Sequence, residues 1–209
     1  MLNAFQPLDH LPKRLESDHI LIRQWYLSDL EEHEALFDDG IAHHLAPWFP
    51  LQTPGQTPSQ KRRAAREKIL MALDRWETGT DYRFFIIEKS TNKIVGQIAI
   101  TGIVRNVNQS AFIGYWIGWE HLNKGLATEA TILAFEYAFE YLKLHRISLW
   151  ISPDNAPSIQ VAKKLELRYE GQIKSALFLG GRWQDTEIYS ILSDEWETRR
   201  AELKMKLLR

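Results

Sequence analysis

Cysteine is absent from the 209 residues of this chain. The absence excludes disulfide bonds, a cysteine nucleophile and zinc sites built on thiolates. A chain that needs no disulfide suits a reducing compartment, so we expect a cytoplasmic protein.

Long apolar runs and an excess of one charge are lacking as well. No stretch approaches the roughly 20 apolar residues that a membrane-spanning helix needs. The first residues, Met-Leu-Asn-Ala-Phe-Gln-Pro, lack the basic and apolar regions of a signal peptide. The formal net charge is only −1, so nothing draws the whole chain to nucleic acid or to an anionic membrane. We therefore expect no membrane partner and no direct nucleic-acid partner.

The patterns that are present predict one α/β domain over residues 1–209, with a core at about 18–193. No internal repeat, low-complexity tract or linker divides the chain. Hydrophobic periodicity, capping residues and turn signals give the order of the expected elements. These are a strand at 18–27, a helix from Ser28, a proline-rich loop at 40–58, a helix at 59–78, β-rich runs at 82–88, 94–102 and 110–119, a helix at 125–142, a strand at 146–152, a helix at 155–165, a hairpin of 168–179 and 183–192 that turns at Gly180-Gly181, and a helix at 194–208.

The most informative segment is Gly114–Ala130, in which a strand runs through a glycine-containing turn into a helix. The free N–H groups and the dipole of a helix start make an anion site. Gly125 allows close approach of a ligand, and Lys124 adds a positive charge. We expect the loop Asn123-Lys124-Gly125-Leu126-Ala127-Thr128 to bind a pyrophosphate. Taken alone, Gly125 fits an ordinary helix-start glycine better, and the spacing fits neither a Walker loop nor the dinucleotide fingerprint.

Further along the chain, other short segments accompany this loop. Together with it they are Gly114-Tyr-Trp-Ile-Gly118, Lys124-Gly-Leu-Ala-Thr-Glu-Ala130, Leu144-His-Arg-Ile147, Pro153-Asp-Asn-Ala-Pro-Ser158, Lys164-Leu165, Glu170-Gly171 and Gly181-Arg-Trp-Gln-Asp185. The ordered set resembles the GNAT acetyltransferases, in particular the RimJ/RimL-type branch that acetylates N-terminal amines of ribosomal proteins. The resemblance covers about residues 18–193.

The resemblance implies a single GNAT domain with a mixed, mostly antiparallel sheet of about seven strands, flanked by helices and opened in a V that holds acetyl-CoA. It also implies which residues bind this cosubstrate. Backbone groups near Ile117 would hold the thioester and pantetheine, and the loop from Leu122 to Thr128 would hold the pyrophosphate. Metal plays no part in the implied chemistry.

Asn155 and Ser158 match the family's polar residues near the pantetheine and the sulfur. We expect both to be catalytic and cofactor-binding residues, with Ser158 donating a proton to the leaving thiolate, directly or through water. Simpler structural roles are open for both: Asn155 precedes Ala-Pro-Ser as a good helix N-cap, and Ser158 then lies in the first helical turn.

The chain departs from the family in three places. Leu122 stands where a Gln or Arg is common, Glu166-Leu167 replaces Gly-Phe after Lys-Leu, and Leu177 stands where some relatives carry an acidic residue proposed as the base. The first loses one side-chain contact to the cosubstrate. The second puts the end of the 155–165 helix in doubt, and the third means that the acidic base cannot be carried over.

The acceptor follows least directly from the sequence. An α-amino group has an intrinsic pKa of about 7.7–8, against about 10.4 for lysine, so it tolerates the missing base better. We expect the acceptor to be an N-terminal α-amine, with a ribosomal protein as one candidate. Residues 43–60 and 175–183 are expected to set the acceptor specificity. Two alternatives stay open: transfer to a small amine, antibiotic or aminoacylated compound, or a catalytically silent acyl-CoA-binding regulator. The protein would be a monomer or a homodimer.

Four other groups of residues carry weaker signals. Glu120 and His121 are candidate bases beside the loop, although a solvent-exposed role is favoured, and His145 is expected to be a packed structural histidine. His43-His44 lacks a third ligand at helical spacing, so no metal site is expected. The basic run at 61–66 fits a solvated helix face better than a contact with ribosomal RNA or an acidic partner.

Overall fold

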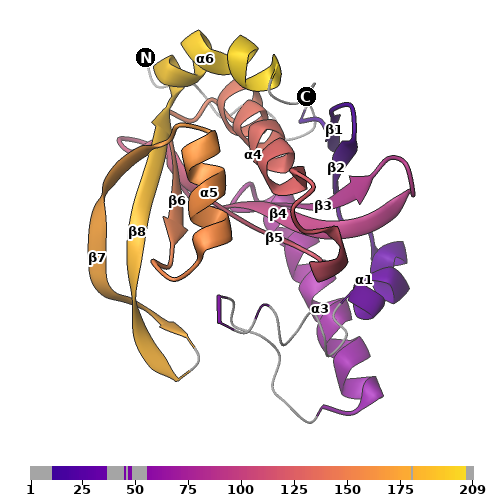
Figure 1. Ribbon diagram of the computed structural model, residues 1–209. Coiled ribbons are helices and arrows are strands. Elements are labelled where there is room, and N and C mark those ends of the chain that lie inside the picture. Colours follow the sequence, from indigo (N-terminus) through magenta and orange to yellow (C-terminus); the bar gives the residue numbers. More distant parts are fainter. Residues whose placement is uncertain (1–10, 37–44, 46, 49–55, 180, 206–209) are drawn as a thin grey trace.

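The computed structural model describes residues 11–36, 45, 47–48, 56–179 and 181–205. Its strands and helices form an α/β fold built on one sheet (Figure 1). The strands are β1 (Arg14–Glu16), β2 (Ile20–Gln24), β3 (Tyr82–Glu88), β4 (Lys93–Val104), β5 (Ser110–Ile117), β6 (Arg146–Ile151), β7 (Arg168–Leu179) and β8 (Arg182–Leu192). The helices are η2 (Leu27–Asp29), α1 (Leu30–Leu36), α3 (Pro58–Glu77), η3 (Trp119–His121), α4 (Leu126–Glu136), η4 (Tyr137–Tyr141), α5 (Ala156–Lys164) and α6 (Ser193–Met205).

The sheet has eight strands in the order β1-β2-β3-β4-β5-β6-β8-β7. Every neighbouring pair is antiparallel except β5 and β6, which are parallel. The expected mixed, mostly antiparallel sheet is therefore confirmed. It has one strand more than the roughly seven expected, because β1 is a three-residue edge strand that no sequence pattern marks.

The two faces of β3 show why this sheet forms a core on both sides. Successive side chains of a strand point to opposite faces. Phe84 and Ile86 join the larger buried cluster together with Phe135 of α4, whereas Phe85 packs in a smaller cluster with Ile69 of α3. A continuous apolar run such as Phe84–Ile87 is what a strand covered on both faces requires.

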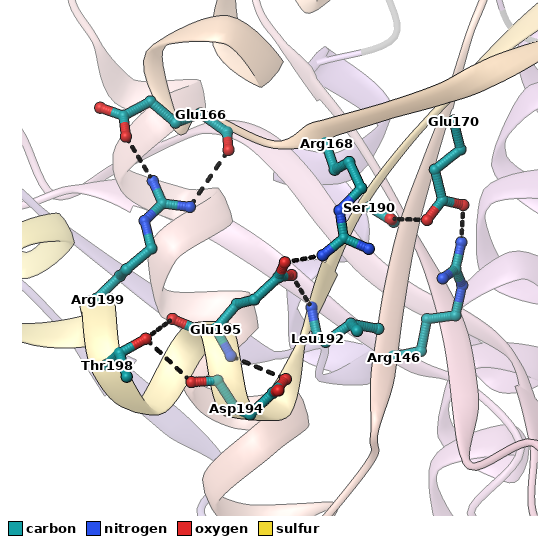
Figure 2. Close-up of polar contacts among 10 residues, drawn as sticks. All are labelled: Arg146, Glu166, Arg168, Glu170, Ser190, Leu192, Asp194, Glu195, Thr198 and Arg199. Atoms are coloured by element: carbon teal, nitrogen blue, oxygen red, sulfur yellow. Dashed lines mark hydrogen bonds and ion pairs between the residues drawn. The ribbon is translucent and has the colours of Figure 1, made fainter.

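The C-terminal elements are tied together by charged side chains, as Figure 2 shows. Arg146 of β6 pairs with Glu170 of β7, which also accepts a hydrogen bond from Ser190 Oγ of β8 at 2.6 Å. Arg168 of β7 pairs with Glu195 of α6. These contacts fix the β7–β8 hairpin to the rest of the sheet at the end where α6 begins.

The replacement of Gly-Phe by Glu166-Leu167 leaves the end of α5 intact. Glu166 takes the left-handed conformation, with φ 50°, that usually falls to glycine after a helix. The Leu167 N–H donates to the Ala162 carbonyl at 3.0 Å, which is the long bond of a Schellman motif. Arg199 of α6 donates to the Glu166 carbonyl at 3.2 Å (Figure 2). It also donates to the Leu165 carbonyl at 3.1 Å, so it supports this strained turn.

Candidate active site

The site begins where β5 and β6 separate. The two strands pair for only three residues, from Ser110↔Arg146 to Phe112↔Ser148. Beyond them residues 113–117 of β5 still pair with β4, and in the described part of the chain their pairing with β6 has ended. A ligand that enters this gap can therefore meet the backbone of β5. A cavity of about 130 Å³ lies there, and it is lined by Trp48, Ile113, Gly114, Tyr115, Leu149, Trp150, Ile151, Ser152, Asn155, Ser158, Leu177, Leu179, Gln184 and Asp185.

Asn155 and Ser158 reach this cavity from the first turn of α5. Asn155 is the N-cap of the helix, and its Oδ1 accepts a hydrogen bond from the Ser158 N–H at 3.2 Å. Both residues also line the cavity. The capping role expected for Asn155 is therefore present. The catalytic and cofactor roles of Asn155 and Ser158 stay predictions.

Tyr115 of β5 also lines this cavity, although no functional role was predicted for it from the sequence. Its hydroxyl is buried and makes no hydrogen bond of ordinary geometry to the described residues. Burial raises the pKa of Tyr115 to about 12, and the neighbouring Ser158 hydroxyl offsets part of that rise. A protonated phenol thus stands beside the serine at pH 7. The sequence feature that could have identified Tyr115 is its place in the Gly114-Tyr-Trp-Ile-Gly118 segment, directly after a glycine of β5.

The loop that precedes α4 has the backbone shape of an anion-binding nest. Asn123 and Gly125 have positive φ angles, of 60° and 81°, and Lys124 between them does not. Alternating left- and right-handed residues turn successive N–H groups toward one point. Within the described part of the chain no acceptor is recorded for the N–H groups of 123–128, and the Glu129 N–H is the next to find one, at Gly125 O (3.1 Å).

Gly125 combines a backbone requirement with open space. Its φ of 81° is one that side chains disfavour, and a Cβ placed there would meet nothing within 4 Å. The side of the loop that faces away from the protein is therefore open to a ligand. Leu122, in place of the common Gln or Arg, is 37% exposed and offers no polar side-chain atom. Ile117 is buried and pairs with Gly96 of β4, so only its backbone could serve a ligand.

A second, wider cavity of about 940 Å³ adjoins this loop. Lys124, Gly125, Leu126 and Thr128 line it, together with Lys89 and Lys164 and several acidic residues. Lys124 Nζ lies 3.8 Å from Glu88 Oε1. Partly exposed ion pairs are weak, so the lysine can exchange this contact for one with a phosphate group. The positive charges and free N–H groups suit a phosphate group, and the binding role of 122–128 stays a prediction.

The other expected residues lie away from the first cavity. Glu120 is exposed, and His121 Nδ1 is 3.9 Å from Glu88 Oε2. His145 is exposed, not packed as expected, because its ring reaches out to Ser193 Oγ at 3.1 Å. In the basic run 61–66, Arg62 and Arg63 are exposed and pair with glutamates, and His43-His44 lies outside the described residues.

In the described part of the chain, no helix is long and apolar enough to cross a membrane.

Comparison with known proteins decides the family. The model of the acetyltransferase (GNAT) domain matches residues 19–168. The chain belongs to the GNAT acetyltransferase family. It is 34% identical over 140 residues to the uncharacterized N-acetyltransferase p20 of Bacillus licheniformis, which is 67% of this chain and 78% of that protein. It is 25% identical over 194 residues to the [ribosomal protein uS5]-alanine N-acetyltransferase of Escherichia coli, which is 90% of this chain and 95% of the relative.

Two solved structures agree with this assignment. RimJ of Mycobacterium smegmatis, in complex with CoA-disulfide, superposes with a TM-score of 0.80 at 25% identity and covers 91% of this chain and 90% of its own. The ribosomal-protein-S5-alanine acetyltransferase of Vibrio fischeri has a TM-score of 0.78 at 26% identity and covers 88% and 98%. The chain is thus an acyltransferase with the GNAT fold, consistent with the RimJ/RimL type. GNAT enzymes use acetyl-CoA as the acetyl donor.

Proposed function

We propose that this protein transfers the acetyl group of acetyl-CoA to the N-terminal α-amine of a protein. A ribosomal protein is the candidate acceptor. The observation that carries the proposal is the pairing of two features. One is the gap between β5 and β6 with the cavity at its side, and the other is the nest at 123–128. A thioester in the gap and a pyrophosphate at the nest would use both. The 90% coverage by the uS5-alanine relative supports the choice of acceptor.

The proposed chemistry needs few side chains. A neutral amine attacks the thioester carbonyl, and the carbonyl oxygen gains negative charge that a backbone N–H of β5, beyond the end of its pairing with β6, can stabilise. The carbon–sulfur bond then breaks, and the sulfur takes a proton from Ser158. The buried hydroxyl of Tyr115 beside Ser158 keeps its proton at neutral pH and can replace the one that the serine gives up. Most of the rate enhancement would come from positioning.

A second acceptor class has one observation in its favour. The chain is 27% identical over 117 residues to the spermidine N(1)-acetyltransferase of Vibrio cholerae, which is 56% of this chain and 67% of that protein. A polyamine has primary amines without a peptide behind them, so the two acceptors place different demands on the surroundings of the cavity. The peptide acceptor is favoured because its relative matches the chain over a greater length.

The test is a panel of amines incubated with acetyl-CoA, with release of free thiol as the measurement. The panel contains peptides with the N-terminal sequences of ribosomal proteins, polyamines and aminoglycosides. We expect turnover on peptides and none on their N-acetylated forms. Turnover on a polyamine or aminoglycoside with no activity on any peptide would refute the acceptor but keep the transfer. Tight acetyl-CoA binding without thiol release on any amine would instead support a silent acyl-CoA-binding regulator.

A further inference from the structure

The cavity between β5 and β6 contains one charged side chain among its described lining residues, the carboxylate of Asp185 on β8. The remaining lining residues are apolar or uncharged, and none is Lys or Arg. In the described part of the chain Asp185 also forms no ion pair. A half-buried carboxylate without a cationic partner, facing a cavity, can form charge-assisted hydrogen bonds with a cationic ligand.

Asp185 is held firmly in place by neutral donors. The Gln172 side chain donates to Oδ2 at 2.7 Å, and the Ser175 N–H donates to Oδ1 at 2.9 Å. Each carboxylate oxygen has a further lone pair, so two acceptor sites stay open. The Ser175 contact coincides with an irregularity of β7 between Ile173 and Leu177, where Ser175 has a φ of 51°. The bulge therefore fixes the orientation of the carboxylate as well as that of the strand.

Aromatic rings stand on the same cavity. Trp48 and Trp150 both line it, and Trp150 is 39% exposed. The face of an indole ring attracts a cation, and a carboxylate binds an ammonium group by charge-assisted hydrogen bonds. A carboxylate together with tryptophan rings is a combination that recognises a primary ammonium group.

We propose that Asp185 binds and orients the ammonium group of the acetyl acceptor, an inference that rests on the proposed function. Leu177 pairs across the hairpin with Gln184, the residue before Asp185. Asp185 thereby supplies, from the neighbouring strand, the negative charge that is missing at Leu177. The overall reaction is R–NH3+ plus acetyl-CoA giving R–NH–CO–CH3, CoA–SH and H+. Before attack the ammonium loses one proton to the Asp185 carboxylate and then to solvent. The freed lone pair forms the C–N bond as the C–S bond breaks.

Asp185→Asn is the principal test, because it removes the charge while the amide oxygen still accepts from the Ser175 N–H, and Gln172 can turn its own amide oxygen toward the new NH2 group. The probe is an alanine-initiated hexapeptide amide, measured by equilibrium binding in the presence of CoA and by KM in the acetyl-transfer assay. We expect Kd and KM for the peptide to rise about 10- to 100-fold, as for loss of a charged hydrogen bond. CoA affinity, and binding of the N-acetylated peptide, which has no ammonium, should not change.

Two further variants separate contact from general charge and from folding. Glu187→Gln removes the same charge on the same strand from a residue that does not line the cavity, and peptide affinity should stay within about twofold. Leu177→Glu added to Asp185→Asn returns a carboxylate to the cavity and should recover affinity. An unchanged Kd in Asp185→Asn, an equal effect of Glu187→Gln, or no recovery in the double variant would each overturn the proposal. Bound peptide without thiol release in the wild type would instead refute the proposed function.

Discussion

Asn155 allows the capping and functional roles of one residue to be measured separately. Its Oδ1 accepts from the Ser158 N–H at 3.2 Å, so Asn155→Ala removes an N-cap of α5. Replacing such a cap by alanine costs about 1 kcal/mol. For a chain of this size that corresponds to a decrease of roughly 2–4 °C in Tm. Asn155→Ser keeps a capping oxygen and should lose only a few tenths of a kcal/mol.

The assay combines thermal unfolding with steady-state acetyl transfer on the three proteins. If the side-chain amide of Asn155 also contacts acetyl-CoA, both variants should lower kcat/KM although only the alanine variant is less stable. Normal kinetics in both would leave the cap as the sole role. An alanine variant that unfolds at the wild-type temperature would refute the reasoning from the cap geometry.

Four other predictions follow from the site and the core. Gly125→Asp should abolish acetyl-CoA binding in calorimetry, whereas Gly181→Asp, with a similar φ of 77° and equally open space, should not; equal affinities in both folded variants would exclude the nest as the binding loop. Ser158→Ala should lower kcat and leave acetyl-CoA affinity nearly intact, and unchanged kinetics would remove Ser158 from the chemistry. Tyr115→Phe should lower kcat less than Ser158→Ala and add nothing to it in the double variant; additive losses would argue against a shared proton path. Burial, and to a smaller extent the charge of a nearby lysine, lowers the pKa of His33 to about 4. As pH falls below 6.5, this histidine is protonated in the unfolded chain before it is protonated in the folded one, so the free energy of unfolding should decrease by about 3 kcal/mol between pH 6.5 and 4. His33→Gln should flatten that decrease in urea titrations, and an unchanged slope would contradict it.

The elements that the sequence predicted well are those with strong local periodicity. The three strands of the meander and the hairpin from Arg168 to Leu192 were predicted nearly to the residue, because alternation and turn residues mark them. β1 was missed because three residues carry no period. The helix expected at 125–142 changes character at Tyr137, where α4 continues as the π-helical η4, and no local signal marks that change.

The candidate site was predictable only in its local parts. The loop at 123–128 and the cap at Asn155 are encoded by neighbouring residues. The meeting of Tyr115 with Ser158, and of Asp185 with the same cavity, depends on strands far apart in the chain. Glu166 in a left-handed turn was a source of doubt because its support comes from Arg199 on α6, a contact that only the tertiary structure reveals.

The brief pairing of β5 with β6 divides the sheet into a five-stranded and a three-stranded block that share only three residue pairs as a seam. A pantetheine arm bound along the open part of β5 would bridge the two blocks. Acetyl-CoA would then do more than deliver an acetyl group, because its binding would also restrict the motion of one block relative to the other. Amide exchange in residues 113–117 and 149–151 should slow together when the donor binds, while exchange within β3 stays unchanged.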